Sequence, residues 1–232
     1  MIGADFEKIE FVVYGLNLLE PMALITDAIM GGLSVYYGIK TLKMKKGNSF
    51  YKLWAMFFLF FGIGSIIGGI GHTFYNYFGL LGKFPSWVSG PIAVYFIEKA
   101  MISLHWNETL KKRLMFWFNV KLVLIYAAFL FILFFVDNPA KPNLPFLPIA
   151  FNTIFGLILT AGILGFKYTQ KISVKFKYFW LGILIMSPSA LIFLFKINLY
   201  QWFDKNDFSH VLITIGITYF YLGLKKLSTG LK

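Results

Sequence analysis

The chain contains no cysteine, and it is poor in charged residues for its length. With no cysteine among 232 residues, disulfide bonds, cysteine-ligated zinc and thiol nucleophiles are excluded. Charged residues make up 14% of the chain, against about 25% in an average soluble domain. Hydrophobic residues make up 58%. This composition is typical of a protein whose main solvent is lipid.

Acidic residues are scarce as well. The chain has 10 Asp and Glu against 22 Lys and Arg, which gives a formal net charge of +12. In a soluble protein such an excess would indicate a nucleic-acid partner. Here most basic residues lie in short loops beside apolar stretches, where they signal topology and contact anionic headgroups. We therefore predict membrane lipids as partners, with anionic headgroups at the basic face, and no nucleic acid.

Long apolar runs dominate the rest of the sequence. Each can cross a hydrocarbon core of ~30 Å at about 1.5 Å per residue. The predicted spans are 21–39, 52–74, 86–106, 114–136, 145–166, 177–197 and 208–224. They predict an all-α, seven-transmembrane-helix bundle that forms a single domain over residues 1–232, with a basic tail at 225–232.

The first 20 residues do not resemble a secretory signal, because they are acidic rather than basic. Phe6, Ile9, Val13 and Leu16 step by three or four residues, which gives one apolar helical stripe before Pro21 interrupts it. We predict an amphipathic helix over 4–19 that lies at the membrane interface or caps the bundle.

The distribution of basic residues predicts the orientation. Fifteen of the 22 Lys and Arg residues fall in the first, third and fifth loops and the tail, and five fall on the opposite side. The positive-inside rule then places the N-terminus outside and the C-terminus in the cytoplasm. A composition rich in Lys, Phe and Ile suits a bacterial inner (plasma) membrane.

Three ionisable residues inside spans are expected to face one another. Asp27 shares a helix face with Gly31, and His72 shares one with Gly68, so both lie on small-residue stripes that pack against neighbouring helices. His210 begins a polar stripe in the last span. Because buried ionisable groups usually face the bundle interior, we expect all three to converge at the lysine-poor end.

Two histidines and a carboxylate are a ligand set typical of Zn²⁺ or Fe²⁺. One interpretation is therefore a metal site of His72, His210 and Asp27, with zinc as the cofactor. The other is a hydrogen-bonded polar cluster without metal.

Glu98 lies deeper, in the third span. It can carry protons or act as a general base. The alternative is a structural role, in which Glu98 pairs with Lys99 or Lys121 or bonds to Tyr95.

Two short motifs resemble those of the seven-helix membrane hydrolase superfamily that includes alkaline ceramidases and progestin/adiponectin receptors. They are Gly-Ser-Ile-Ile-Gly-Gly-Ile-Gly-His-Thr-Phe at 64–74 and Asn-Asp-Phe-Ser-His at 206–210. The resemblance implies an intramembrane Zn²⁺ and hydrolysis of a lipid amide by metal-bound water. It makes His72 and His210 ligands and Ser65 the serine of the second helix. The chain departs from the family at Asn206, where a histidine is expected, and at Gly68, where the serine is expected.

Three hypotheses for function follow. In the first, the protein is a metal-dependent hydrolase of a lipid amide or ester, with Ser65 assisting the oxyanion and Glu98 moving protons. In the second, it is a non-enzymatic transporter, proton-coupled carrier or sensor of a small-molecule or lipid ligand. In the third, it is a structural protein whose polar residues only hold helices together.

Overall fold

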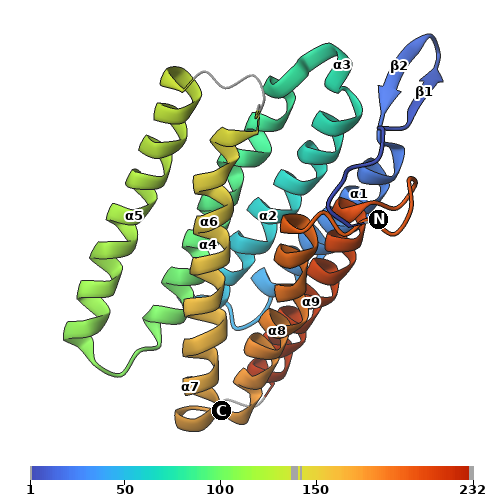
Figure 1. Cartoon of the computed structure of the whole chain (residues 1–232). Helices are drawn as coiled ribbons and strands as arrows, with labels where there is room; N and C mark the ends of the chain where they lie inside the picture. The colour runs from blue at the N-terminus through green and yellow to red at the C-terminus, as the bar shows by residue number, and fades with distance from the viewer. Residues whose placement is uncertain (1, 137–140, 142, 230–232) are drawn as a thin grey trace.

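The computed structural model describes residues 2–136, 141 and 143–229 as a bundle of helices with one short hairpin at its end (Figure 1). The hairpin strands are β1 (Glu10–Val13) and β2 (Leu16–Leu19). The helical elements are α1 (Pro21–Leu42), α2 (Ser49–Thr73), α3 (Tyr75–Phe78), the 3-10 helix η1 (Gly79–Lys83), α4 (Phe84–Ser103), α5 (Glu108–Phe135), the 3-10 helix η2 (Leu144–Phe146), α6 (Leu147–Leu157), the π-helix η3 (Ile158–Leu164), α7 (Gly165–Lys171), the 3-10 helix η4 (Val174–Phe176), α8 (Lys177–Leu194) and α9 (Lys205–Ser228).

Six helices in the described part of the chain are long and apolar enough to cross a membrane. They are α1, α2, α5, the continuous rod over Leu144–Lys171, the segment Val174–Leu194, and α9. The prediction of an all-α fold is therefore confirmed, and six apolar helices fit the prediction of a multi-pass membrane protein. Most of the stretch predicted as a seventh span, 86–106, lies in the 20-residue helix α4 within the bundle, which carries Glu98 and Lys99 and is not among these six.

The predicted amphipathic helix over 4–19 is wrong, because residues 10–19 form the β1–β2 hairpin and the described residues before them are not helical. The strands pair antiparallel, with Glu10 opposite Leu19 and Val13 opposite Leu16. Tyr14 and Gly15 make the turn with φ of +50° and +79°. Positive φ at both central residues is the conformation of a two-residue hairpin turn, and a Gly at the second position favours it. The turn at Tyr14 and Gly15, rather than the spacing of apolar residues by three or four, therefore determines the structure of this segment.

Small residues bring α1 and α2 into close contact. A Cβ placed on Gly31 would lie 2.6 Å from the carbonyl oxygen of Gly62, and one placed on Gly62 would lie 2.6 Å from that of Gly31. The Ser34 hydroxyl donates to the carbonyl of Phe58 across the same interface, at 2.8 Å. Near the lysine-rich end, large aromatic side chains such as Trp54 and Phe220 fill the core.

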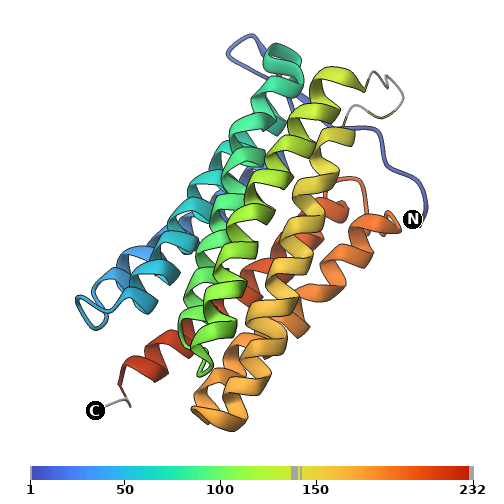
Figure 2. The same cartoon turned by 90° about the vertical axis from the view of Figure 1, so that its left-hand side faces the viewer.

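Helix α5 lies at the edge of the bundle (Figures 1 and 2). Phe129 is its one buried residue among those described. Its ties to α4 include polar contacts, in which Tyr126 donates to the carbonyl of Val88 at 2.5 Å and Lys121 pairs with Glu98. Large apolar side chains of α5, among them Val123, Leu124 and Phe131, are exposed, as expected of a helix that faces lipid.

Candidate functional site

Five ionisable side chains from α1, α2 and α9 gather at the lysine-poor end of the bundle. We call Glu20, Asp27, His72, Asp207 and His210 the acidic–histidine cluster. Glu20 immediately precedes α1, while Asp207 and His210 lie in the first two turns of α9. Helix α1 packs against both α2 and α9. The three helices therefore bring the five side chains to the same end of the bundle.

Glu20 and His72 form the first half of this cluster. His72 Nδ1 lies 2.8 Å from Glu20 Oε2, and Lys8 Nζ lies 2.7 Å from Glu20 Oε1. Burial by itself would raise the pKa of Glu20. The hydrogen bond and charge of His72, together with the charge of Lys8, outweigh burial and lower that pKa to about 2. Glu20 is therefore an anion at every physiological pH.

His210 organises the second half. The Thr26 hydroxyl lies 2.9 Å from His210 Nδ1 and also donates to Asp207 Oδ1 at 2.9 Å. His210 Nε2 faces Asp27 Oδ1 at 3.7 Å. The Ala23 carbonyl, at 3.3 Å, is another acceptor for the Thr26 hydroxyl. When the Thr26 proton goes to Asp207 or to Ala23, the Thr26 oxygen accepts from His210 Nδ1–H. That tautomer leaves Nε2 turned toward the Asp27 carboxylate, so this pair is placed to bind and release a proton.

The start of α9 is fixed by a capping box that includes a cluster member. Asp204 Oδ1 accepts from the backbone N–H of Asn206 at 2.7 Å and of Asp207 at 3.3 Å, and Asp207 Oδ2 accepts from the Asp204 N–H at 3.2 Å. Asp207 thus holds both the helix terminus and Thr26.

The proposed metal ligands do not form one site. His210 approaches Asp27, but His72 bonds to Glu20 instead. Among the described residues, no group of three or more His, Cys, Asp or Glu side chains is placed to hold a metal ion. The zinc prediction finds no support in this geometry, and we derive no step through a metal.

A cavity of about 180 Å³ lies inside the bundle, bounded by α2, α4, α6, α8 and α9. We call it the central cavity. Its walls are mainly apolar, with hydroxyls from Ser65, Ser86, Ser89 and Thr153. Ser65, predicted from the sequence as a catalytic residue, lies in this wall and donates to the carbonyl of Phe61 at 3.0 Å.

The central cavity adjoins the acidic–histidine cluster across a bare face of α2. A Cβ placed on Gly68 would lie 3.0 Å from Ser86 Oγ and 4.0 Å from Asp27 Oδ2. Ser86 lines the cavity, and Asp27 belongs to the cluster. The missing side chain at Gly68 therefore leaves the hydroxyl and the carboxylate close to the same point.

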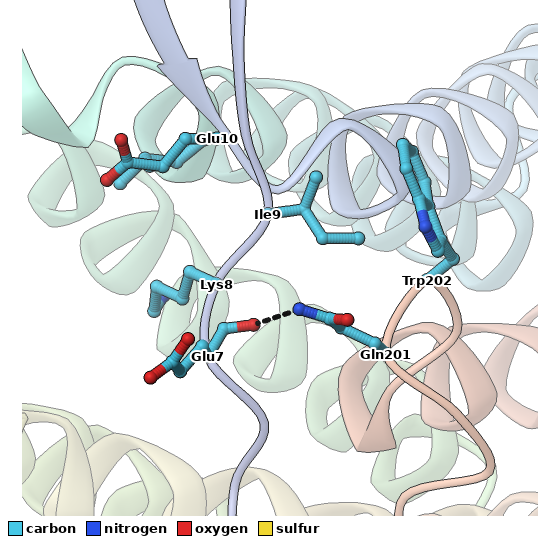
Figure 3. Close-up of a pocket in the computed structure, with 7 residues that line it drawn as sticks. Glu7, Lys8, Ile9, Glu10, Gln201 and Trp202 are labelled. Carbon is cyan, nitrogen blue, oxygen red and sulfur yellow. Dashed lines mark hydrogen bonds between the residues drawn. The ribbon is translucent and has the colours of Figure 1, made fainter.

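A surface groove of about 750 Å³ lies beside the cluster, between the N-terminal segment and the loop before α9 (Figure 3). Gln201 Nε2 donates to the backbone carbonyl of Glu7 across it, at 3.3 Å. Lys8 lines the groove and also pairs with Glu20. The groove is therefore linked to His72 through Lys8 and Glu20.

Glu98 lies apart from the cluster, between α4 and α5. It is completely buried and pairs with Lys121, one of the two lysines that the sequence suggested. The Tyr95 hydroxyl donates to Asn119 and not to Glu98. This placement separates the predicted catalytic residues, Ser65 and Glu98, from the histidines.

The family model that matches the chain covers residues 22–229 and describes a family of unknown function, DUF6962. The chain belongs to this family. No curated protein and no solved structure matches it. The DUF6962 match spans every helix that contributes to the cluster and to the central cavity, and begins just after Glu20.

Sequence reasoning missed Thr26, Ser86 and the pairing of Glu20 with His72. In the sequence, nothing distinguishes Thr26 from any other threonine inside an apolar helix. It could have been found only by its position one residue before Asp27. Ser86 lies near the start of α4, where serine is common because it can cap a helix.

Proposed function

We propose that this DUF6962 chain is a seven-span membrane protein that binds a lipid-like amphiphile in the central cavity, with the polar head of that molecule at the acidic–histidine cluster. One observation carries the proposal: Ser86, which lines the apolar cavity, and the buried carboxylate of Asp27 both lie within 4.0 Å of the Cβ position at Gly68. A binding site with apolar walls and a few convergent polar groups is the usual form of a ligand pocket.

The seventh span in this proposal is α4, and the N-terminus lies outside the cell. Glu98 in α4 faces the bundle rather than lipid, since it is completely buried. A polar side chain on an inward face does not prevent a helix from spanning. The basic loops then lie in the cytoplasm, and the cluster lies toward the outer surface.

The hydroxyls of the cavity suit a ligand with a weakly polar region. Ser65, Ser89 and Thr153 each donate to a carbonyl of their own helix, at 2.9 to 3.0 Å. Their oxygens can still accept hydrogen bonds. These groups would receive donors from a bound molecule, while the surrounding aromatic and aliphatic side chains would enclose its apolar part.

A second candidate function is acid–base chemistry on the bound head group, such as hydrolysis of a lipid ester or amide. The observation that favours it is the position of His210 between Thr26 and Asp27. An imidazole held by a hydroxyl on one nitrogen and facing a carboxylate on the other has the arrangement of a general base. This is the hydrolase hypothesis without the metal.

Photolabelling in nanodiscs tests the binding proposal. The probe is a monoacylglycerol with a diazirine and an alkyne on its acyl chain. Thr153→Phe fills the central cavity, whereas Thr153→Val removes the hydroxyl and keeps the volume. We expect Thr153→Phe to lose most of the labelling of cavity peptides and Thr153→Val to retain it. Equal labelling of wild type and folded Thr153→Phe would overturn the proposal.

The same probe, which is an ester, tests the second candidate. Release of its fatty acid by the wild type, lost in His210→Ala while photolabelling persists, would support hydrolysis. Photolabelling of the wild type without release of fatty acid would support binding and contradict hydrolysis of this ester.

A further inference from the structure

We propose that Glu98, Lys121 and Asn152 form a second binding site, between α4, α5 and α6, that takes the hydroxyl group of a neutral, membrane-dissolved molecule such as a long-chain alcohol. This inference does not depend on the central cavity. It rests on a different set of buried polar groups, on different helix faces.

Two nearly inaccessible side chains in this region have hydrogen-bonding capacity that no neighbour uses. Glu98 has no exposed surface and Asn152 is 2% exposed. Glu98 Oε1 pairs with Lys121, yet within the described part of the chain Glu98 Oε2 and both polar atoms of Asn152 have no hydrogen-bond partner. A buried polar atom without a partner costs about 1–3 kcal/mol, and a bound molecule with a suitable donor and acceptor would remove that cost.

The two side chains lie at the same helix interface. A Cβ on Gly156 would approach Glu98 Oε1 to 2.5 Å, which places Gly156 against α4. Asn152 lies one turn before Gly156 and therefore on the same face of α6. Because Gly156 has no side chain, α6 packs directly against Val94 and Glu98 of α4.

The charges and donors of this site specify a neutral ligand. The Glu98 carboxylate and the Lys121 ammonium cancel, so a charged group would meet a like charge. What remains is an acceptor at Glu98 Oε2 together with the donor and acceptor of the Asn152 amide. A hydroxyl group is both donor and acceptor, and it complements this set.

Access from the lipid side is compatible with the position of α5. Lys121 keeps 27% of its side chain exposed, although it lies near the middle of that helix. An amphiphile in the bilayer can therefore contact Lys121, and α5, which buries little of its surface, must move away from α4 to admit it to the buried Glu98. The π-helix η3, which begins two residues after Gly156, interrupts regular α-helical geometry beside the site.

Val94 separates this site from the central cavity. It lines the cavity, and its Cγ1 would lie 2.4 Å from a Cβ on Gly156. The residues of α6 that line the cavity, Ile149, Thr153 and Leu157, form a stripe next to the one that carries Asn152. Variants can therefore address each site separately.

The test uses a photoreactive, clickable hexadecanol in nanodiscs, with the corresponding hydrocarbon without the hydroxyl as its control. Asn152→Leu replaces the amide by an apolar group of similar size. We expect labelling of α4 and α6 peptides by hexadecanol to fall about tenfold in Asn152→Leu, as the loss of a buried hydrogen-bonded pair predicts. Labelling by the hydrocarbon should not change, and Thr153→Phe should leave hexadecanol labelling intact.

Gly156→Ala gives a second variant, because its Cβ would collide with Val94 and with Glu98 Oε1 and displace the Glu98 carboxylate, and it should reduce hexadecanol labelling as well. Unchanged labelling in folded Asn152→Leu would overturn the proposal. So would an Asn152→Leu protein that is more stable than wild type and shows equal labelling, since the polar groups would then hold only water. Failure of the central-cavity test would leave this result unaffected, because the two sets of variants are distinct.

Discussion

Glu20 Oε2 and His72 Nδ1 lie 2.8 Å apart and join the residue before α1 to the last turn of α2. Glu20 has φ of +48°, a left-handed conformation that few non-glycine residues adopt. Its backbone N–H donates to the carbonyl of Ile9 at 3.0 Å, which also fixes the base of the hairpin. Through its backbone and its side chain, Glu20 therefore connects the hairpin, two helices and the surface groove.

Stability at low pH should depend on Glu20. Its pKa is about 2 in the folded protein against an ordinary value of 4.5. A lowered pKa stabilises the fold above pH 4.5, and this contribution is lost as the pH falls toward 2. We expect Glu20→Gln to lower the free energy of unfolding at pH 7, by roughly 3 kcal/mol at most.

Thermal unfolding in detergent between pH 7 and pH 2 measures this effect. The melting temperature of the wild type should fall more steeply below pH 4.5 than that of Glu20→Gln. Glu7→Gln is the control, because the Glu7 side chain is exposed. Parallel pH profiles for wild type and Glu20→Gln would contradict the account.

The contact of α1 with α2 should be sensitive to a single methyl group. Gly31→Ala places a Cβ 2.6 Å from both the Gly62 carbonyl oxygen and the Ile66 side chain, so the helices must separate. We expect a loss of about 1–3 kcal/mol in unfolding free energy.

Gly32→Ala is the matched control for this prediction. A Cβ at Gly32 meets nothing within 4 Å, so alanine there should be neutral or should stabilise the helix by up to about 1 kcal/mol. Equal melting temperatures for the two variants would show that α1 and α2 do not pack as described.

The capping box of α9 should contribute to the geometry of the cluster. Asp204→Ala removes the acceptor for the N–H groups of Asn206 and Asp207. We expect a loss of about 1 kcal/mol and faster hydrogen exchange in the first turn of α9. Asp204→Asn retains a capping oxygen and should lose much less. An unchanged hydrogen-exchange rate in Asp204→Ala would show that the capping box does not stabilise the first turn of α9.

The absence of cysteine makes the topology directly measurable. Single-cysteine variants at Tyr14, in the hairpin turn, and at Lys43, after α1, can be labelled in intact cells with a membrane-impermeant maleimide. We expect labelling of Tyr14→Cys without permeabilisation and labelling of Lys43→Cys only after it. The reverse pattern would invert the proposed orientation.

The same method tests whether α4 crosses the membrane. Leu81→Cys and Glu108→Cys flank this helix, and both positions are exposed. If α4 is the seventh span, the two should react from opposite sides. Reaction from one side would mean that α4 does not cross.

Much of the architecture could be predicted from sequence because hydrophobic length is a strong signal in lipid. The meeting of Asp27 with His210 also followed from helix faces, since small residues mark the packed side of α1. The hairpin could not be predicted from the spacing of apolar residues, because one Gly15 turn outweighs that pattern. Thr26 and Ser86 were missed because a hydroxyl in a helix is indistinguishable from ordinary surface or capping chemistry.

Native mass spectrometry of the purified protein tests the central claim most directly. The account predicts that wild-type protein and Thr153→Val carry one added mass of a lipid-like molecule through detergent exchange, and that Thr153→Phe, equally folded, does not. A wild type without any such adduct, or an adduct that persists in Thr153→Phe, would contradict binding in the central cavity.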